Sequence, residues 1–151
     1  MLARDIMTTQ PIAVSIHASV ASIMQLMVDR QISAVIVTSP DDVVIGIVSE
    51  GDIVHHQGSA HQARLDHWLA QIAEGADLNA EFLRSLQLSE HTAATIMSAP
   101  AITLEETATI AEVADVLDKH RIKRVPITKN GKLVGIVSRR DMLRALLSET
   151  R

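Results

Sequence analysis

Apolar residues recur along the chain with two different periods. In two stretches, about ninety positions apart, they fall at i, i+3, i+4 and i+7, which is the spacing of one face of an α-helix. The first set comprises Val20, Ile23, Met24 and Met27, and the second comprises Ile110, Val113, Ala114 and Leu117. The pattern therefore predicts two amphipathic helices, each with one face directed toward a core.

Each predicted helix is followed by two runs rich in β-branched residues. These runs occupy residues 32–38 and 43–48 in the first half of the chain, and residues 122–128 and 132–137 in the second half. Turn residues separate the runs of each pair, and Asn130 with Gly131 suits a tight hairpin. The second run of each pair then enters a related motif, GIVSEGDI from Gly46 and GIVSRRDM from Gly135. The chain is thus predicted to contain a β-α-β-β-α unit twice.

This duplication predicts a mixed α+β fold. We expect a first repeat over residues 1–54, a helical insert over residues 55–91 and a second repeat over residues 92–151. In each Ser-x-x-Asp motif the serine, Ser49 or Ser138, stands where a helix N-cap is expected. The aspartate, Asp52 or Asp141, falls at the third helical position. Each pair is therefore interpreted first as a capping box, and a functional role needs further support.

The composition excludes several classes of protein. Hydrophobic residues make up 47% and charged residues 21% of the 151 residues, as in globular domains. The formal charge of −4 and the scarcity of aromatic residues argue against a nucleic-acid partner. We expect no membrane span and no signal peptide, because the sequence has neither a long apolar run nor an apolar segment at its start. Cysteine is absent, which favours a cytoplasmic location.

Taken together, the two copies resemble the tandem cystathionine-β-synthase (CBS) domain pair, also called a Bateman module. The resemblance covers about residues 2–54 and 92–147. It rests on Ile-Met followed by proline, on RQISAVIV and HRIKRVPI, and on GIVSxxD. It implies that the two repeats pack pseudo-symmetrically through their sheets. It also implies two clefts between the repeats, which in this family often hold adenosine-containing ligands.

The same resemblance assigns residues to two clefts. In cleft A we expect Ser49, Asp52, Pro100, Ile122, Lys123, Arg124 and Arg140. In cleft B we expect Thr9, Gln10, Pro11, Ile32, Ser33, Ala34, Ser138 and Asp141. The aspartates would accept hydrogen bonds from ribose hydroxyls, and the cations of cleft A would bind phosphate. Cleft A is therefore favoured for AMP, ADP, ATP or a dinucleotide, and cleft B for a neutral adenosyl group or for nothing.

Two observations work against this assignment. Lys123 and Arg124 have an alternative interpretation as charges on a solvated strand edge. The chain also departs from the family pattern, since Ile36 stands where the second copy has Pro126, and neither Gln10 nor Ala99 offers a hydroxyl before the proline of its motif. Recognition of adenine would then depend on backbone groups.

The insert holds the only Trp and the only Phe of the chain, Trp68 and Phe82. Its apolar spacing predicts two short helices whose apolar face covers either the core of the same chain or a partner. The insert is also rich in histidine, at His55, His56, His61 and His67. Histidine is a common zinc ligand, but the sequence supplies neither cysteine nor an HExxH motif, so we predict no metal site.

The sequence contains no glycine-rich phosphate loop and no nucleophile elbow, so we do not expect an enzyme. We expect a regulatory module that senses AMP, ADP, ATP, NAD(H), S-adenosylmethionine or a related adenosyl metabolite and that requires no cofactor. A homodimer is also expected, with contacts through the helices around Val20–Met27 and Ile110–Leu117. The alternative is a structural dimer with empty clefts that docks a regulated partner protein through the insert.

Overall fold

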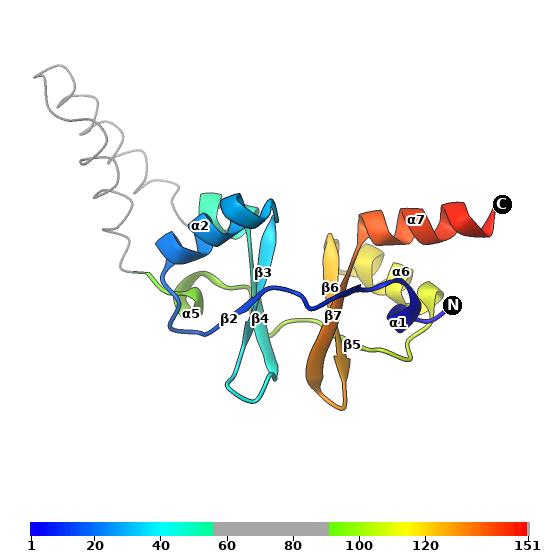
Figure 1. The fold of residues 1–151 in the computed structure, drawn as a ribbon, viewed down its shortest axis with the longest axis horizontal. Coiled ribbons are helices and arrows are strands. Elements are labelled where there is room, and N and C mark those ends of the chain that lie inside the picture. Colours follow the sequence, from blue (N-terminus) through cyan, green and yellow to red (C-terminus); the bar gives the residue numbers. More distant parts are fainter. Residues whose placement is uncertain (56–90, 151) are drawn as a thin grey trace, which may run out of the picture.

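Two small β-sheets lie next to each other in the middle of the molecule in this computed structural model, which describes residues 1–55 and 91–150 (Figure 1). The first sheet has the order β2-β3-β4, with β2 (Ala13–Val14), β3 (Ala34–Thr38) and β4 (Val44–Ser49). The second has the order β1-β7-β6-β5, with β1 (Thr8–Thr9), β5 (Leu104–Glu105), β6 (Arg124–Lys129) and β7 (Lys132–Ser138). The long strands of each sheet form an antiparallel hairpin, and a short strand is added in parallel by β2 or β5.

Helices cover the outer side of each sheet (Figure 1). In the first repeat these are α2 (Val20–Arg30) and the helical residues 50–55. In the second repeat they are α6 (Ile110–Lys119) and α7 (Arg139–Glu149). The order strand, helix, strand, strand, helix thus occurs twice. This arrangement confirms the predicted α+β fold of two repeats that pack pseudo-symmetrically through their sheets.

The predicted helix faces are correct except at one position. In α2, Val20 and Ile23 are fully buried and Met27 is nearly so. In α6, Val113 and Leu117 are buried, but Ala114 is exposed. The prediction for Ala114 was wrong because the buried stripe of α6 passes through Val116, on the other side of Val113.

The predicted hairpin turn at Asn130 and Gly131 is confirmed. Both residues have positive φ angles, 54° and 82°, as a two-residue turn between twisted antiparallel strands requires. The carboxylate of Glu105 accepts hydrogen bonds from the backbone N–H groups of both residues, at 3.3 and 3.2 Å. The parallel strand β5 therefore holds the tip of the β6–β7 hairpin.

The segment that leads into each repeat packs on the other repeat. The short helix α1 (Ala3–Ile6) and strand β1 join the second repeat, because Ala3 is fully buried in its core and β1 pairs with β7. The counterpart helix α5 (Ala93–Ile96) joins the first repeat, where Ala93 is fully buried near Val20. Figure 1 shows this exchange, since the N-terminal segment starts beside α6 and α7 and then crosses to the first sheet.

Two glycines of the GIV motifs lie beneath these crossing segments. A Cβ atom added at Gly46 would lie 2.8 Å from both the Met97 sulfur and the Ser98 carbonyl oxygen. A Cβ atom at Gly135 would collide with Met7 in the same way. The glycines are therefore needed for close approach of two backbone segments, at positions where their φ angles are ordinary.

The predicted helices of the insert, with Trp68, Phe82 and three of its histidines, lie outside the described residues. His55 is described and its side chain is exposed. Within residues 1–55 and 91–150, no helix has the length and apolar character needed to cross a bilayer.

Candidate functional site

A cleft of about 370 Å³ opens between the two repeats. It is lined by cleft A residues Ser49, Asp52, Pro100, Ile122, Lys123 and Arg124, together with Ser33, Ile47, Glu50, Gly51, Ser98, Ala101, Ile102 and Arg121. Arg140, which was also expected there, does not line it. Ser33 was assigned to cleft B but lines cleft A. The volume lies in the range of small-molecule sites.

The Asp52 carboxylate divides its two oxygens between two partners. Oδ2 accepts hydrogen bonds from the backbone N–H of Ser49 at 2.9 Å and from the Ser49 hydroxyl at 3.1 Å. The Ser49 hydroxyl in turn accepts from the Asp52 backbone N–H at 3.2 Å, which confirms the predicted capping geometry. Oδ1 instead accepts from the Ser98 hydroxyl at 3.0 Å. Asp52 is therefore a helix cap through one oxygen, and it presents the other oxygen to the cleft.

Arg124 joins the two repeats across the cleft. Its Nη2 donates a hydrogen bond to the Ser33 hydroxyl at 2.8 Å, although the two residues are far apart in the sequence. Burial lowers the pKa of the Arg124 guanidinium, and the nearby carboxylates of Glu50 and Asp52 raise it in part. Arg124 is thus a partly desolvated cation in the wall of the cleft, and a bound anion would stabilise it.

The rest of the lining supplies an apolar wall and further positive charge. Ile47 and Ile122 come from the two repeats, and Ile102 and Pro100 come from the segment after α5. Lys123 and Arg121 lie beside Arg124 on the side of the second repeat. Cleft A therefore combines apolar surface, the carboxylates of Asp52 and Glu50, and a group of cations.

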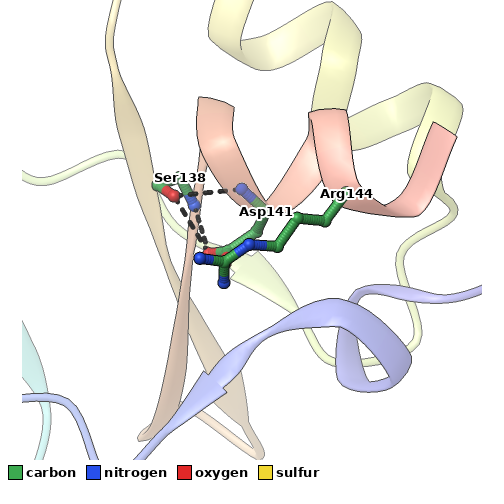
Figure 2. A network of polar contacts seen from close by, with 3 residues as sticks. All are labelled: Ser138, Asp141 and Arg144. Atoms are coloured by element: carbon green, nitrogen blue, oxygen red, sulfur yellow. Dashed lines mark hydrogen bonds and ion pairs between the residues drawn. The ribbon is translucent and has the colours of Figure 1, made fainter. Parts of the chain in front are cut away.

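The second Ser-x-x-Asp motif has different surroundings. Ser138 and Asp141 repeat the capping box, with Oδ2 of Asp141 accepting from the Ser138 backbone N–H at 2.9 Å and from its hydroxyl at 3.1 Å (Figure 2). The other oxygen, Oδ1, lies 3.9 Å from Nη1 of Arg144, one turn further along α7 (Figure 2). Asp141 is nearly buried, with 8% of its surface exposed.

A cavity of about 350 Å³ beside Asp141 does not have the lining expected for cleft B. Asp141 is the one residue expected in cleft B that lines it, and the rest of the lining is Met1, Asp5, Ile6, Met7, Thr8, Arg144, Ala145 and Ser148. Thr9, Gln10, Pro11, Ile32, Ser33, Ala34 and Ser138 are not part of it. This lining differs from the expected one because the crossing segment α1–β1 and one face of α7 enclose the cavity. Ser33, which was expected here, instead contacts Arg124 in cleft A.

Sequence reasoning missed four polar residues of cleft A: Ser33, Glu50, Ser98 and Arg121. Ser98 follows the Ile-Met pair of the second repeat, so the alignment of the two copies marks its position. Its proximity to Asp52 depends on the crossing of the segment after α5, which pairs Ser98 with Ile47. No local pattern in the sequence encodes this crossing.

The described part of the chain contains no group of three or more histidine or acidic side chains arranged to hold a metal ion. Of the four histidines weighed as zinc ligands, only His55 belongs to the described residues. The other three, His56, His61 and His67, lie outside them.

Comparison with known proteins places this chain in a family. The model of the CBS domain matches residues 3–59 and 93–148, so the chain belongs to the CBS domain family and carries the domain in tandem. These two segments coincide with the two structural repeats described above.

Individual relatives share the whole arrangement. Hypoxic response protein 1 of Mycobacterium tuberculosis is 27% identical over 144 residues, which cover 95% of this chain and 84% of the relative. Its crystal structure, with two coordinated zinc ions, has a TM-score of 0.67 at 26% identity and covers 95% of this chain and 98% of the relative.

Two ligand-bound structures have the same fold at lower identity. CBSX2 of Arabidopsis thaliana in complex with AMP has a TM-score of 0.73 at 20% identity, with coverage of 99% of this chain and 98% of the other. The CBS domain pair of protein MJ0100, in complex with 5′-methylthioadenosine and S-adenosyl-L-methionine, has a TM-score of 0.71 at 20% identity and the same coverage.

Proposed function

We propose that this protein is a regulatory module that binds an adenosine-containing ligand in cleft A. The observation that carries the proposal is the meeting of Asp52, Arg124 and an apolar wall in one cleft between the repeats. The ligands of two proteins with the same fold, AMP in CBSX2 and two adenosyl compounds in the MJ0100 pair, support it.

The lining suits each part of a nucleotide. Oδ1 of Asp52 accepts a hydrogen bond from a ribose hydroxyl. Ile47 and Ile122 offer apolar surface to the adenine ring. Lys123 and Arg124 bind the phosphate, and Arg124 would exchange its hydrogen bond with Ser33 for a stronger one to an anion. A phosphorylated ligand is therefore favoured over a neutral adenosyl group.

The proposed role is binding without catalysis. Two serine hydroxyls lie next to the Asp52 carboxylate in this cleft: Ser49 makes the hydrogen bonds of a helix cap, and Ser98 donates to Oδ1. A sensor also needs a state that binds its ligand less well than another state does. The protein whose activity is regulated is proposed to lie elsewhere, and the absence of cysteine favours a cytoplasmic setting.

The proposal is tested by thermal unfolding in the presence of AMP, ADP, ATP, NAD(H) or S-adenosylmethionine. A ligand at a hundred times its dissociation constant stabilises the folded state by about 2.7 kcal/mol. Wild type is expected to respond to at least one phosphorylated member of this set, and Asp52→Ala is expected to lose the response. A response that survives in Asp52→Ala and is lost in Asp141→Ala would assign the ligand to the second motif instead.

A second candidate function is assembly into a homodimer, and one observation favours it. Helix α7 leaves Leu143, Leu146 and Leu147 exposed on one face, at i, i+3 and i+4. The helices around Val20–Met27 and Ile110–Leu117 are the other candidates for this contact, because only one face of each packs in a core. Light scattering on wild type and on Leu143→Glu with Leu147→Glu tests the assembly. A dimer that persists in the double variant would exclude this face.

A further inference from the structure

The Ser98 hydroxyl occupies one of the two acceptor positions on Oδ1 of Asp52, the oxygen that a ligand hydroxyl would meet. Its donor oxygen lies 3.0 Å from Oδ1, which is the carboxylate oxygen not used in the helix cap. We propose that Ser98 is an intramolecular competitor for the ligand at Asp52 and thereby limits the preference of cleft A for ribose over 2′-deoxyribose. This inference rests on the proposed function.

The number of hydrogen bonds that the Asp52 carboxylate can accept limits how many ligand hydroxyls it can bind. A carboxylate oxygen accepts about two hydrogen bonds. Oδ2 already accepts two, both from Ser49. Oδ1 accepts one, from Ser98. One position is therefore left for a ligand hydroxyl while Ser98 is bound, and both hydroxyls of a ribose diol are accommodated only when Ser98 releases Oδ1.

The backbone of Ser98 is held independently of its side chain. The Ser98 N–H donates to the Ile47 carbonyl at 2.8 Å, and the Ile47 N–H donates to the Ser98 carbonyl at 3.1 Å. The residue itself is exposed, so its hydroxyl is free to rotate toward water. Replacement of Ser98 by alanine therefore removes the competitor and leaves this wall of the cleft in place.

Comparison with the second repeat shows that a serine hydroxyl at Oδ1 of the aspartate is found in cleft A and not at Asp141. Thr8 pairs with Ile136 of β7 as Ser98 pairs with Ile47 of β4. Near Asp141, however, the group beside Oδ1 is the Arg144 guanidinium at 3.9 Å. The two aspartates have the same cap and different second partners. The contact of the Ser98 hydroxyl with Oδ1 of Asp52 is therefore specific to this cleft and is not a consequence of the capping motif.

Calorimetric titration with AMP and with 2′-deoxy-AMP tests the proposal. Ser98→Ala is expected to bind AMP about threefold to tenfold more tightly than wild type, which is the effect of one lost competing hydrogen bond. Its gain for 2′-deoxy-AMP is expected to be smaller, because one hydroxyl already has an acceptor position in wild type. Ser98→Thr, which keeps the hydroxyl, is expected to resemble wild type.

Ser22→Ala is the matched control, since it removes an exposed serine hydroxyl that donates to its own helix backbone at 2.8 Å. It is expected to bind both nucleotides as wild type does. If wild type binds AMP and a folded Ser98→Ala variant binds it equally well or more weakly, this inference is overturned and the proposed function stands. Absence of AMP binding in wild type and in every variant would overturn both.

Discussion

At the scale of single residues, Arg124 carries the proposed preference of cleft A for a phosphorylated ligand. It is half-buried, it spans the cleft to Ser33, and two carboxylates lie near it. Burial lowers the pKa of the Arg124 guanidinium, and the charges of Glu50 and Asp52 oppose this effect. A phosphate would add a charge-assisted hydrogen bond in a site where water is partly excluded.

Replacement of Arg124 by glutamine is therefore expected to weaken AMP binding by about tenfold or more and to change the affinity for adenosine little, because a hydrogen bond to a charged group is worth more than a neutral one. Arg30→Gln, an equal change of charge at an exposed position of α2, is the control. Parallel titrations with AMP and adenosine make the measurement. An equal loss for both ligands would show that Arg124 does not contact the phosphate.

Asp52 can serve both as a helix cap and as a ligand-binding residue. Its two oxygens serve different partners, so the same side chain stabilises the start of a helix and faces the cleft. The Ser-x-x-Asp motif alone favours the interpretation as a helix cap. The partner at Oδ1 distinguishes the two aspartates: it is Ser98, 46 residues away along the chain, for Asp52, and Arg144 for Asp141.

At the scale of elements, the crossing segments determine which residues the strands can carry. The segment from Met97 to Ser98 lies directly on β4 at Gly46, and the segment at Met7 lies on β7 at Gly135. Both contacts involve backbone atoms, which cannot move aside as a flexible side chain can. The glycine in each GIV motif is therefore part of the contact between the repeats.

Gly46→Ala is expected to lower the free energy of unfolding by about 1–3 kcal/mol, as for other insertions of a methyl group into a filled space. Gly51→Ala is the control: the added Cβ would meet only the Ser49 hydroxyl oxygen, at 3.6 Å, in a helix where alanine is favoured. Urea unfolding of both variants provides the comparison. Equal stability of Gly46→Ala and wild type would contradict the close approach seen here.

The elements themselves were largely predictable because their signals are local. Helical spacing, β-branched runs and the Asn130–Gly131 turn each extend over a few residues. They were sufficient to predict the main helices and strands of both repeats. Ala114 was the exception, because the direction of a helix face depends on what packs against it. The exchange of α1 and α5 was not predictable, since Ala3 and Ala93 differ from a surface alanine only through distant partners.

At the scale of the whole molecule, each core contains residues from both sequence repeats. Ala3 precedes the first repeat's own helix and is buried in the second core, while Ala93 is buried in the first. Val43 and Lys132 add a bridge between the two hairpins, and the Leu133 N–H donates to the Asp42 carbonyl at 2.9 Å. Each repeat is therefore incomplete without the other.

Substitutions in the exchanged segments are expected to act on the opposite repeat. Ala3→Ser buries a hydroxyl in the second core, at a cost of about 1–3 kcal/mol. Amide hydrogen exchange is expected to accelerate more in β6 and β7 than in β3 and β4. Ala93→Ser is the matched variant and is expected to show the reverse. Acceleration in the repeat to which each residue belongs by sequence would contradict the exchange.

The candidate site was predictable to the extent that its residues lie at the ends of repeated motifs. Six of the seven residues expected in cleft A line one cavity, because the end of β4 and the start of β6 meet between the repeats. Of the eight residues expected in cleft B, Asp141 lines the cavity beside α7. Its surroundings are determined by α1, α7 and the contact between Ser33 and Arg124, which are long-range features.

The central claim, that cleft A binds a nucleotide through Asp52, is tested most directly by calorimetric titration of AMP into wild type and Asp52→Asn. The substitution keeps the size of the side chain and removes the charge that a ribose hydroxyl would meet. We predict one AMP per chain in wild type and a loss of binding of about tenfold or more in Asp52→Asn, because a hydrogen bond to a charged acceptor is removed. Equal AMP affinity in the two proteins would contradict the claim.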